Sequence, residues 1–335
     1  MPRRTSHPLQ IFRLAGDLGI KSPGAPTEAI LGYCDGQIRA ILKEVGPCGT
    51  LAELLDWVAN KVETTFRMIY TDRDLADVKA EFIEKGEAAF VKLESDLGPE
   101  VFGITYRRLK RERWEPQFVS VIDCRGEKAP RSYFTKWHEI AHLLTLTSQT
   151  RLVFRRTHSE ISSSDPEEGL MDTIAGRFGY YGPIFHPGIS DEISFSEIER
   201  LRNQLCPESS QLASIINFIK YWPTPCLHVR AELGWNNREK RFLDQGSFSF
   251  VERPEPVLRL VKVTPNDAAR KPRSPLFKNM RVPASSLLHR IFIEQIDYQE
   301  GTESLSGWTE RSNATIKIKA RLTGDGVEAL LIPLS

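Results

Sequence analysis

The segment His-Glu-Ile-Ala-His at residues 138–142 constrains this chain more than any other feature of its sequence. Residues four positions apart lie on one face of an α-helix, so the imidazoles of His138 and His142 can bind one metal ion if the segment is helical. Glu139 lies about 100° further around such a helix, where a carboxylate can take a proton from a metal-bound water instead of binding the ion. A stripe of apolar residues predicts that this helix is buried against a core: Phe134, Trp137, Ile140, Ala141 and Leu144.

The motif is too specific to be expected by chance. Random placement of the 7 histidines and the glutamates of a 335-residue chain gives roughly 0.01 such segments. The alternative interpretation is a pair of structural histidines that happen to lie four residues apart. The sequence favours a Zn²⁺ ion bound by His138 and His142, with Glu139 as the catalytic base.

A catalytic zinc ion takes a third protein ligand and leaves a fourth position for water. No histidine follows His142 within the next ten residues, so a carboxylate from a separate helix is indicated. A helix is predicted over residues 165–180, with Asp165 as its N-cap and a proline at its first position. Glu168 and Asp172 lie four residues apart on one face of that helix, and either side chain could reach the ion.

Two segments of the chain together resemble the ImmA/IrrE-type zinc metallopeptidases. The first is Phe-Thr-Lys-Trp-His-Glu-Ile-Ala-His-Leu-Leu at residues 134–144, and the second is residues 172–179, which precede a Tyr-Gly-Pro turn. In that family a segment of the form Glu-x-x-Ala-Asn-x-Phe-Ala supplies the third metal ligand. The resemblance, which covers residues 50–185, implies a zincin-like fold for that part of the chain.

The second segment matches the family pattern only in part. Ala175 and Phe178 match it, Asp172 takes the place of the glutamate, and glycines replace the asparagine and the final alanine. The resemblance favours Asp172 as the third ligand, which leaves Glu168 to accept a hydrogen bond from an imidazole N–H. The implied metal ligands are therefore His138, His142 and Asp172.

The resemblance implies a zinc-dependent endopeptidase that cleaves a regulatory protein, such as a helix-turn-helix transcriptional repressor. Radiation-response members of the family have a similar length and layout, with a zincin-like domain, a helical middle and a β-rich, sensor-like end. Because Asp172 and Gly176 replace the usual residues, the alternative is a non-hydrolytic regulatory or binding protein that retains a zincin-like fold.

The distribution of apolar residues predicts an α+β fold in four parts. Residues 1–26 are expected to form a flexible N-terminus, residues 188–223 a helical linker region, and residues 224–335 a β-rich C-terminal domain. The family resemblance implies that residues 27–187 form a zincin-like metallopeptidase domain and that the C-terminal domain has a sensor or partner-binding role. Before the motif, helices are expected at residues 28–43, 51–65 and 72–96, and strands at 66–70, 101–106 and 118–122. In the C-terminal part, strands are expected at residues 227–233, 257–263, 291–296, 315–322 and 327–332.

Charge and cysteine content bear on partners and location. Lys and Arg total 45 against 44 Asp and Glu, a net charge of +1 that gives no global attraction to nucleic acid or anionic membranes. The 5 cysteines include no Cys-x-x-Cys pair, and no apolar window reaches membrane-spanning length, so we expect a cytoplasmic protein. The expected partner is a protein substrate, without membrane or direct nucleic-acid contact, and the oligomeric state is left open. The basic residues within 107–113 are expected to form a solvated hairpin loop.

Overall fold

The computed structural model describes residues 8–21, 24–146, 153–157, 165–190, 192–244, 254–269, 274–310 and 312–334. Over these residues the chain is a mixed α+β protein with a four-stranded and a five-stranded sheet. It divides into an N-terminal unit, Met1–Gly188 with Arg200–Ser214, and a C-terminal unit, Ile189–Glu199 with Ile215–Ser335. The predicted linker region contains helices α9 (Phe195–Leu205) and α10 (Gln211–Lys220), and each of them crosses the division.

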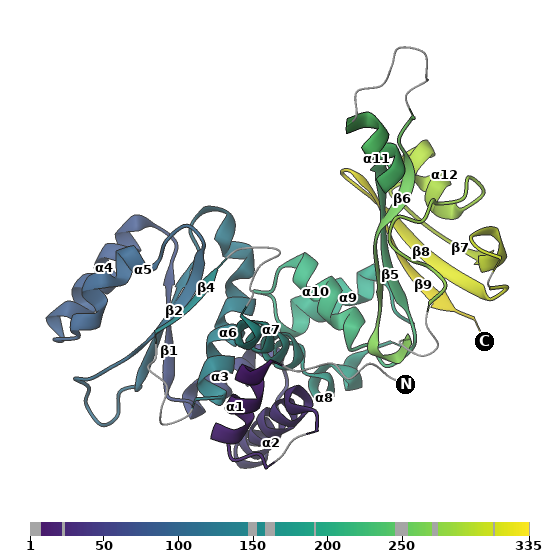
Figure 1. Cartoon of the computed structure of the whole chain (residues 1–335). Helices are drawn as coiled ribbons and strands as arrows, with labels where there is room; N and C mark the ends of the chain where they lie inside the picture. The colour runs from purple at the N-terminus through teal and green to yellow at the C-terminus, as the bar shows by residue number, and fades with distance from the viewer. Residues whose placement is uncertain are drawn as a thin grey trace. The chain divides into compact units, whose positions relative to one another are not determined.

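The N-terminal unit is built around the four-stranded sheet, whose strand order is β1-β3-β2-β4. Strand β1 runs parallel to β3, whereas β2 runs antiparallel to both of its neighbours. Helix α4 lies on one side of the sheet and α6 on the other (Figure 1). The elements, with η for 3₁₀ helices, are α1 (Leu9–Asp17), α2 (Pro26–Val45), α3 (Leu51–Lys61), β1 (Thr64–Ile69), α4 (Asp72–Glu84), η1 (Ala88–Lys92), α5 (Leu93–Asp96), β2 (Val101–Arg107), β3 (Phe118–Asp123), η2 (Gly126–Arg131), α6 (Ser132–Leu144), β4 (Val153–Thr157), α7 (Pro166–Gly179), α8 (Gly182–Phe185) and η3 (His186–Gly188).

The two faces of this sheet differ in chemistry, because side chains alternate along each strand. On the α4 side, Ile104 and Val121 join an apolar core with residues of α4, η1 and α5. On the α6 side, the neighbouring positions carry the buried hydroxyls of Thr105 and Ser120. The α6 helix therefore packs on a face of the sheet that offers polar side chains.

Helix α1 falls inside the stretch for which the sequence predicted a flexible N-terminus, so the structure differs from that prediction. Pro8 precedes the first residue of α1, and Pro26 is the first residue of α2, positions where a helix tolerates proline. Ile11 and Leu14 recur at helical spacing and are buried where α1 packs near α2 and α7. Pro8 and Pro26 thus mark helix starts, while Pro2 and Pro23 lie outside the described residues.

The elements around the motif are confirmed. The strands expected at 101–106 and 118–122 are β2 and β3, and the motif helix is α6. Helix α7 begins as predicted, with the Asp165 carboxylate accepting the backbone N–H of Glu167. The single helix expected at 72–96 is wrong, since α4 ends at Glu84 and the chain turns at Gly86, whose φ of 78° is a left-handed conformation that favours glycine.

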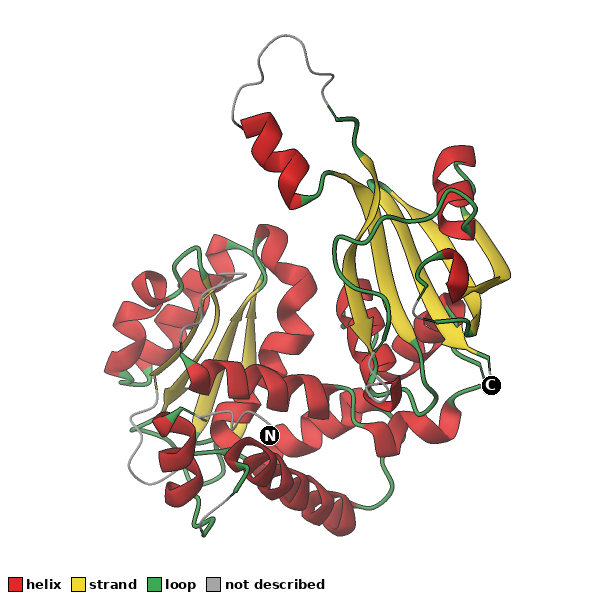
Figure 2. Cartoon of the chain, turned by 45° about the vertical axis from the view of Figure 1, so that its right-hand side comes forward, coloured by secondary structure: helices red, strands yellow, loops and turns green. Residues whose placement is uncertain are grey.

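The C-terminal unit contains the five-stranded antiparallel sheet, with strand order β6-β5-β9-β8-β7. Figure 2 shows the strands of both sheets in yellow and the helices in red. Helix α12 packs on β7, β8 and β9 over an apolar core. The elements are β5 (Leu227–Gly234), α11 (Asn237–Asp244), β6 (Val257–Pro265), η4 (Asp267–Ala269), α12 (Leu287–Glu294), β7 (Tyr298–Ser304), η5 (Leu305–Gly307), β8 (Thr315–Thr323) and β9 (Gly326–Pro333).

Four of the five strands expected in this unit are confirmed, and the strand expected at 291–296 is wrong. That run belongs to α12, where Ser286 caps the helix and Leu287, Leu288 and Ile291 are buried at helical spacing. Strand β7 was missed because it lies at the edge of the sheet and consists mostly of polar residues. Because apolar residues do not alternate along β7, the sequence pattern does not indicate this edge strand.

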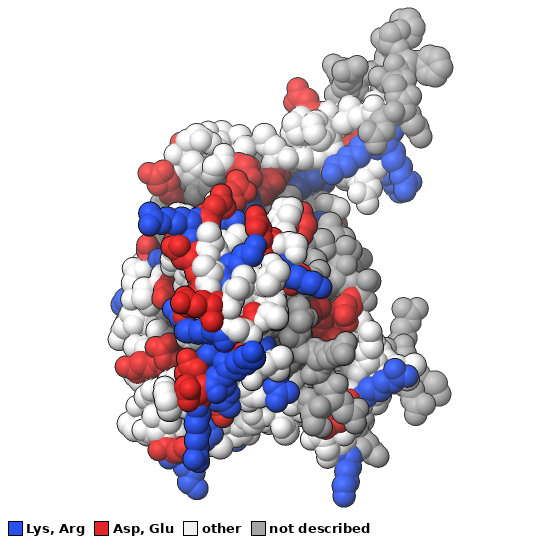
Figure 3. All heavy atoms as spheres, turned by 90° about the vertical axis from the view of Figure 1, so that its left-hand side faces the viewer, with Lys and Arg blue, Asp and Glu red and all other residues white. Residues whose placement is uncertain are grey.

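The basic cluster at 107–113 lies in the connection between β2 and β3, and part of it is paired. Arg108 is buried and contacts Glu87 and Glu115, while Arg111 contacts Glu63. On the face shown in Figure 3, blue Lys and Arg side chains are interspersed with red Asp and Glu side chains. Among the described residues, no helix is both long and apolar enough to cross a bilayer.

Asn266 joins the start of β5 to the turn that follows β6. Its fully buried amide donates from Nδ2 to the carbonyl oxygens of Trp222 (3.1 Å) and Thr224 (2.7 Å). Its Oδ1 accepts the backbone N–H groups of Cys226 (3.1 Å) and Ala269 (2.9 Å). Every hydrogen-bonding position of this amide is therefore used.

We expect Asn266→Asp to lower the free energy of unfolding by about 3 kcal/mol or more, because a carboxylate oxygen would face two carbonyl oxygens in a dry site. Urea unfolding of the variant at neutral pH measures the effect. Asn313→Asp, at an exposed position, serves as the control and should leave stability nearly unchanged. Equal stability of the two variants would contradict the proposed role of the amide.

Candidate metal centre

Helix α6 carries the motif and is buried along almost its whole length. Trp137 and Ile140 face the core and are fully buried, as the apolar stripe predicted. His138, Glu139 and His142 are buried as well, with exposed fractions of 1%, 0% and 3%. Buried polar groups need hydrogen-bond or metal partners, so the residues around α6 determine which interactions these three side chains can make.

Helix α7 approaches α6 closely because Gly179 has no side chain. A Cβ atom at this position would lie 3.0 Å from Cδ1 of Trp137. The Tyr133 hydroxyl donates to the Gly179 carbonyl oxygen across 2.7 Å and ties the two helices together. This contact places the first turns of α7, with its carboxylates, beside the motif histidines.

Two imidazole nitrogens and the carboxylate of Glu168 converge between α6 and α7. Nε2 of His138 lies 3.1 Å from Nε2 of His142 and 3.1 Å from Oε2 of Glu168, and Nε2 of His142 lies 3.4 Å from Oε1 of Glu168. Ligands about 2.0–2.1 Å from a tetrahedral zinc ion stand about 3.3 Å apart, so the observed spacing fits such an ion. His138, His142 and Glu168 form a group that could hold a metal ion.

Asp172, the sequence-favoured third ligand, lies on the other side of the His138 ring. Its Oδ1 is 2.9 Å from Nδ1 of His138, while Nε2 of the same ring faces Glu168. A proton on Nδ1 that is donated to Asp172 leaves the Nε2 lone pair directed at the convergent group. The structure thus brings His138, His142 and Glu168 together and sets Asp172 behind one of the histidines.

The charge of Glu168 suits a ligand. Its burial favours the neutral carboxyl, but the hydrogen bonds with His138 and His142 outweigh burial and hold its pKa well below the usual range. An ionised carboxylate and two imidazole nitrogens then face one point. This mixed nitrogen and oxygen set is one that zinc accepts, and it resembles catalytic sites with two histidines and one carboxylate.

The Glu139 side chain lies in the contact between α6 and the sheet. Its Oε2 accepts a hydrogen bond of 2.7 Å from the hydroxyl of Thr105 on β2. Its Oε1 is buried and has no hydrogen-bond partner among the described residues. Burial raises the pKa of Glu139, although His142, His138 and the Thr105 hydrogen bond act in the opposite direction. One carboxylate oxygen is therefore anchored, and the other accepts no hydrogen bond from the described residues.

Gly103 allows strand β2 to approach Glu139. A Cβ atom at this position would lie 2.7 Å from Cγ2 of Thr135 and 2.9 Å from Oε1 of Glu139. The pairing of β2 with β4 also shifts register between Val101 and Ile104, which is where this glycine lies. Sequence analysis missed Gly103 and Thr105; the only sequence signal was a glycine and a hydroxyl within an otherwise apolar strand.

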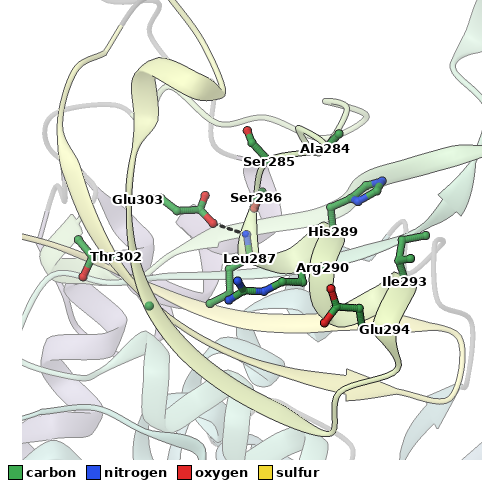
Figure 4. Close-up of a pocket in the computed structure, with 11 residues that line it drawn as sticks. Ala284, Ser285, Ser286, Leu287, His289, Arg290, Ile293, Glu294, Thr302 and Glu303 are labelled. Carbon is green, nitrogen blue, oxygen red and sulfur yellow. Dashed lines mark hydrogen bonds between the residues drawn. The ribbon is translucent and has the colours of Figure 1, made fainter.

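The C-terminal unit has a hollow in which the carboxylate of Glu303 is paired at both oxygens. The hollow has a volume of about 420 Å³ and lies between α12 and β7. Figure 4 shows Glu303 directed at the start of α12, where it accepts the backbone N–H of Leu287. The other carboxylate oxygen accepts the indole N–H of Trp308 (2.9 Å). The chain's own carboxylate therefore occupies the position where an anion would bind this helix.

The metal centre is thus defined by side chains from two helices and one strand. Helix α6 supplies two imidazoles and a buried carboxylate, α7 supplies a third ligand atom and a partner for one imidazole, and β2 anchors the buried carboxylate. Comparison with protein-family models and with curated proteins finds no match to this chain.

We expect Gly103→Ala to displace Glu139 or Thr135, because the added methyl group would lie closer to both side chains than real contacts allow. Overpacking of this kind costs about 1–3 kcal/mol, which urea unfolding of the metal-free protein can measure. Gly98→Ala is a matched control, since a Cβ atom there meets open space. Unfolding of both variants at the same urea concentration would contradict the close approach of β2 to Glu139 at Gly103.

Proposed function

We propose that this chain is a zinc-dependent endopeptidase in which Glu139 is the catalytic base. The observation that carries the proposal is the convergence of two imidazole nitrogens and one carboxylate at tetrahedral spacing, next to a buried carboxylate with one free oxygen. A structural pair of histidines would need no third ligand atom at that spacing. The resemblance of residues 134–144 to the ImmA/IrrE-type metallopeptidases supports the same chemistry.

We assign the third ligand to Glu168 and a supporting role to Asp172, the reverse of the preference drawn from the family pattern. Glu168 lies within reach of both Nε2 atoms, whereas Asp172 lies at Nδ1 of His138. Carboxylates that accept the second N–H of a metal-binding histidine fix its ring and raise its basicity. A shorter aspartate at the family's glutamate position fits this role, because a separate glutamate one turn earlier reaches the metal.

Each residue then has a definite task in peptide hydrolysis. A zinc ion held by His138, His142 and Glu168 would lower the pKa of a coordinated water toward about 7 and polarise the carbonyl of the scissile bond. Glu139 accepts the proton of the attacking water at Oε1 and later gives it to the leaving amine. Thr105 holds the other carboxylate oxygen, and the complete burial of Glu139 keeps bulk water away from it.

The wider setting of the proposal is a zincin-like domain that acts on a regulatory protein. Its supports are the packing of α6 on one face of a mixed sheet, the carboxylates of α7 and the family resemblance. A helix-turn-helix repressor is the proposed substrate class, because family members cleave such proteins and the near-zero net charge favours recognition of a protein over a polyanion. The free thiols of the 5 cysteines are compatible with a reducing compartment such as the cytoplasm.

Replacement of Glu139 tests the reaction. Glu139→Gln keeps the shape of the side chain but cannot accept a proton, so we expect loss of peptide cleavage by at least about 100-fold with zinc content unchanged. The assay incubates the full chain and zinc with a helix-turn-helix repressor encoded beside it and follows cleavage by mass spectrometry. A wild-type protein that binds zinc and leaves every candidate uncut would instead be a regulatory binding module, and a Glu139→Gln variant that still cuts would exclude Glu139 as the base.

Two conservative variants test the division of roles on α7. Glu168→Gln should abolish stoichiometric zinc binding, because the third ligand loses its charge, whereas Asp172→Asn should weaken affinity by about 10- to 100-fold. Competition of each purified variant with a chromophoric zinc chelator gives the affinities. Zinc retained by Glu168→Gln and lost by Asp172→Asn would restore Asp172 as the ligand.

A further inference from the structure

Three buried hydroxyls form a chain across the sheet that ends at Glu139. The Thr64 and Ser120 hydroxyl oxygens lie 3.0 Å apart, those of Ser120 and Thr105 lie 2.7 Å apart, and Thr105 donates to Oε2 of Glu139 across 2.7 Å. The exposed fraction is 4% for Thr64 and 0% for the other three side chains. The chain runs through β1, β3 and β2 to α6.

Glu139, the acceptor at the end of this series of hydroxyls, determines the direction of the hydrogen bonds. An ionised carboxylate only accepts hydrogen bonds, and each hydroxyl has a single proton to donate. Thr105 therefore gives its proton to Glu139 and accepts one from Ser120, which in turn accepts one from Thr64. Three O–H groups are aligned head to tail toward Oε2, an arrangement in which each hydrogen bond polarises the next.

The sheet holds these hydroxyls in place through its backbone. Thr105 and Ser120 are direct cross-strand partners in the antiparallel pairing of β2 and β3. Ser120 is also the cross-strand partner of Phe66 in the parallel pairing with β1, and Thr64 lies two residues before Phe66 on the same face. Neighbouring strands lie about 4.8 Å apart, so each hydroxyl oxygen reaches the next without a bridging water.

We propose that Thr105, backed by Ser120 and Thr64, is the positioning residue for the catalytic carboxylate. By binding Oε2 it fixes the rotation of the Glu139 side chain and leaves Oε1 as the oxygen that accepts the proton of the attacking water. This inference rests on the proposed peptidase function and extends it to residues of the sheet. Thr105 acts through Glu139, and its effect is on the orientation of that side chain.

Loss of this anchor has a definite chemical consequence. Without the Thr105 hydroxyl, both oxygens of a buried carboxylate would lack a hydrogen bond, and the carboxylate would turn toward other donors or the metal ion. A displacement of about 1 Å at a reacting group can cost about 100-fold in rate. Thr105 therefore controls the fraction of molecules in which Glu139 is correctly oriented.

The first test uses the metal-free protein and needs no substrate. Two spectra are recorded for the wild type and for each Thr105 variant, one with Glu139 present and one with Glu139→Gln. Subtracting the second infrared spectrum from the first isolates the carboxyl bands of Glu139. We expect Thr105→Val, which is isosteric but lacks the hydroxyl, to shift the Glu139 band at a fixed pH. Thr105→Ser should leave the band near its wild-type position. Ser120→Ala should give a smaller shift than Thr105→Val, because it removes only the second hydroxyl of the chain.

The second test measures turnover of the zinc-loaded protein on the repressor substrate. Thr105→Val should lower kcat by about 10- to 100-fold with KM and zinc content unchanged, and Thr105→Ser should recover most of that loss. Thr135→Val is a matched control, since it deletes a buried hydroxyl of α6 that donates to the Arg131 carbonyl oxygen instead of Glu139. Thr135→Val should share any loss of stability that Thr105→Val shows, but it should keep the wild-type Glu139 band and the wild-type kcat.

The two tests separate failure of this inference from failure of the proposed function. An unshifted Glu139 band in Thr105→Val overturns the inference, whether or not the protein cleaves peptides. A shifted band together with an inactive wild-type protein supports the hydrogen-bond chain and rejects the peptidase. A loss of kcat in Thr135→Val equal to that in Thr105→Val would show a general packing effect and would also overturn the positioning role.

Discussion

The candidate metal centre depends on two close approaches to helix α6, each at a glycine. Gly103 lets strand β2 come within hydrogen-bonding distance of Glu139, and Gly179 lets helix α7 pack against Trp137. A Cβ atom at Gly103 would displace the side chain of Thr135 or Glu139, and one at Gly179 would be in tight contact with Trp137. The ligand atoms of α7 and the hydroxyl of β2 reach the motif because the backbones are this near.

Two polar side chains of the candidate centre each use two atoms in different ways. His138 presents Nε2 to Glu168 and Nδ1 to Asp172, and Glu139 presents Oε2 to Thr105 while Oε1 accepts no hydrogen bond from the described residues. In both cases one atom is bound by the protein so that the other has a fixed position. The surroundings of the motif therefore matter as much as the motif itself, because they decide which atoms are available for chemistry.

Sequence analysis predicted the parts of this centre that are local in the chain. The helical spacing of His138 and His142 and the N-cap of α7 follow from periodicity and capping, and both helices are present. The choice between Glu168 and Asp172 depends on the rotation of α7 against α6, which no local pattern encodes. Thr105 was missed for a similar reason, since its role comes from the register of β2 and β3. A different error was made at α12, where a short apolar run was predicted to be a strand because the residue that caps the helix was not considered.

The free oxygen of Glu139 has a consequence for how this protein responds to selection. A buried acceptor that receives no hydrogen bond from the described residues lowers the stability of the fold, so Glu139 is held at a position where the sheet and helix would pack better around an apolar or fully bonded group. Variants selected only for resistance to heat should therefore accumulate replacements here early. A lineage that no longer needed the reaction would lose Glu139 before it lost the helix, and its descendants would keep the architecture of the centre without its activity.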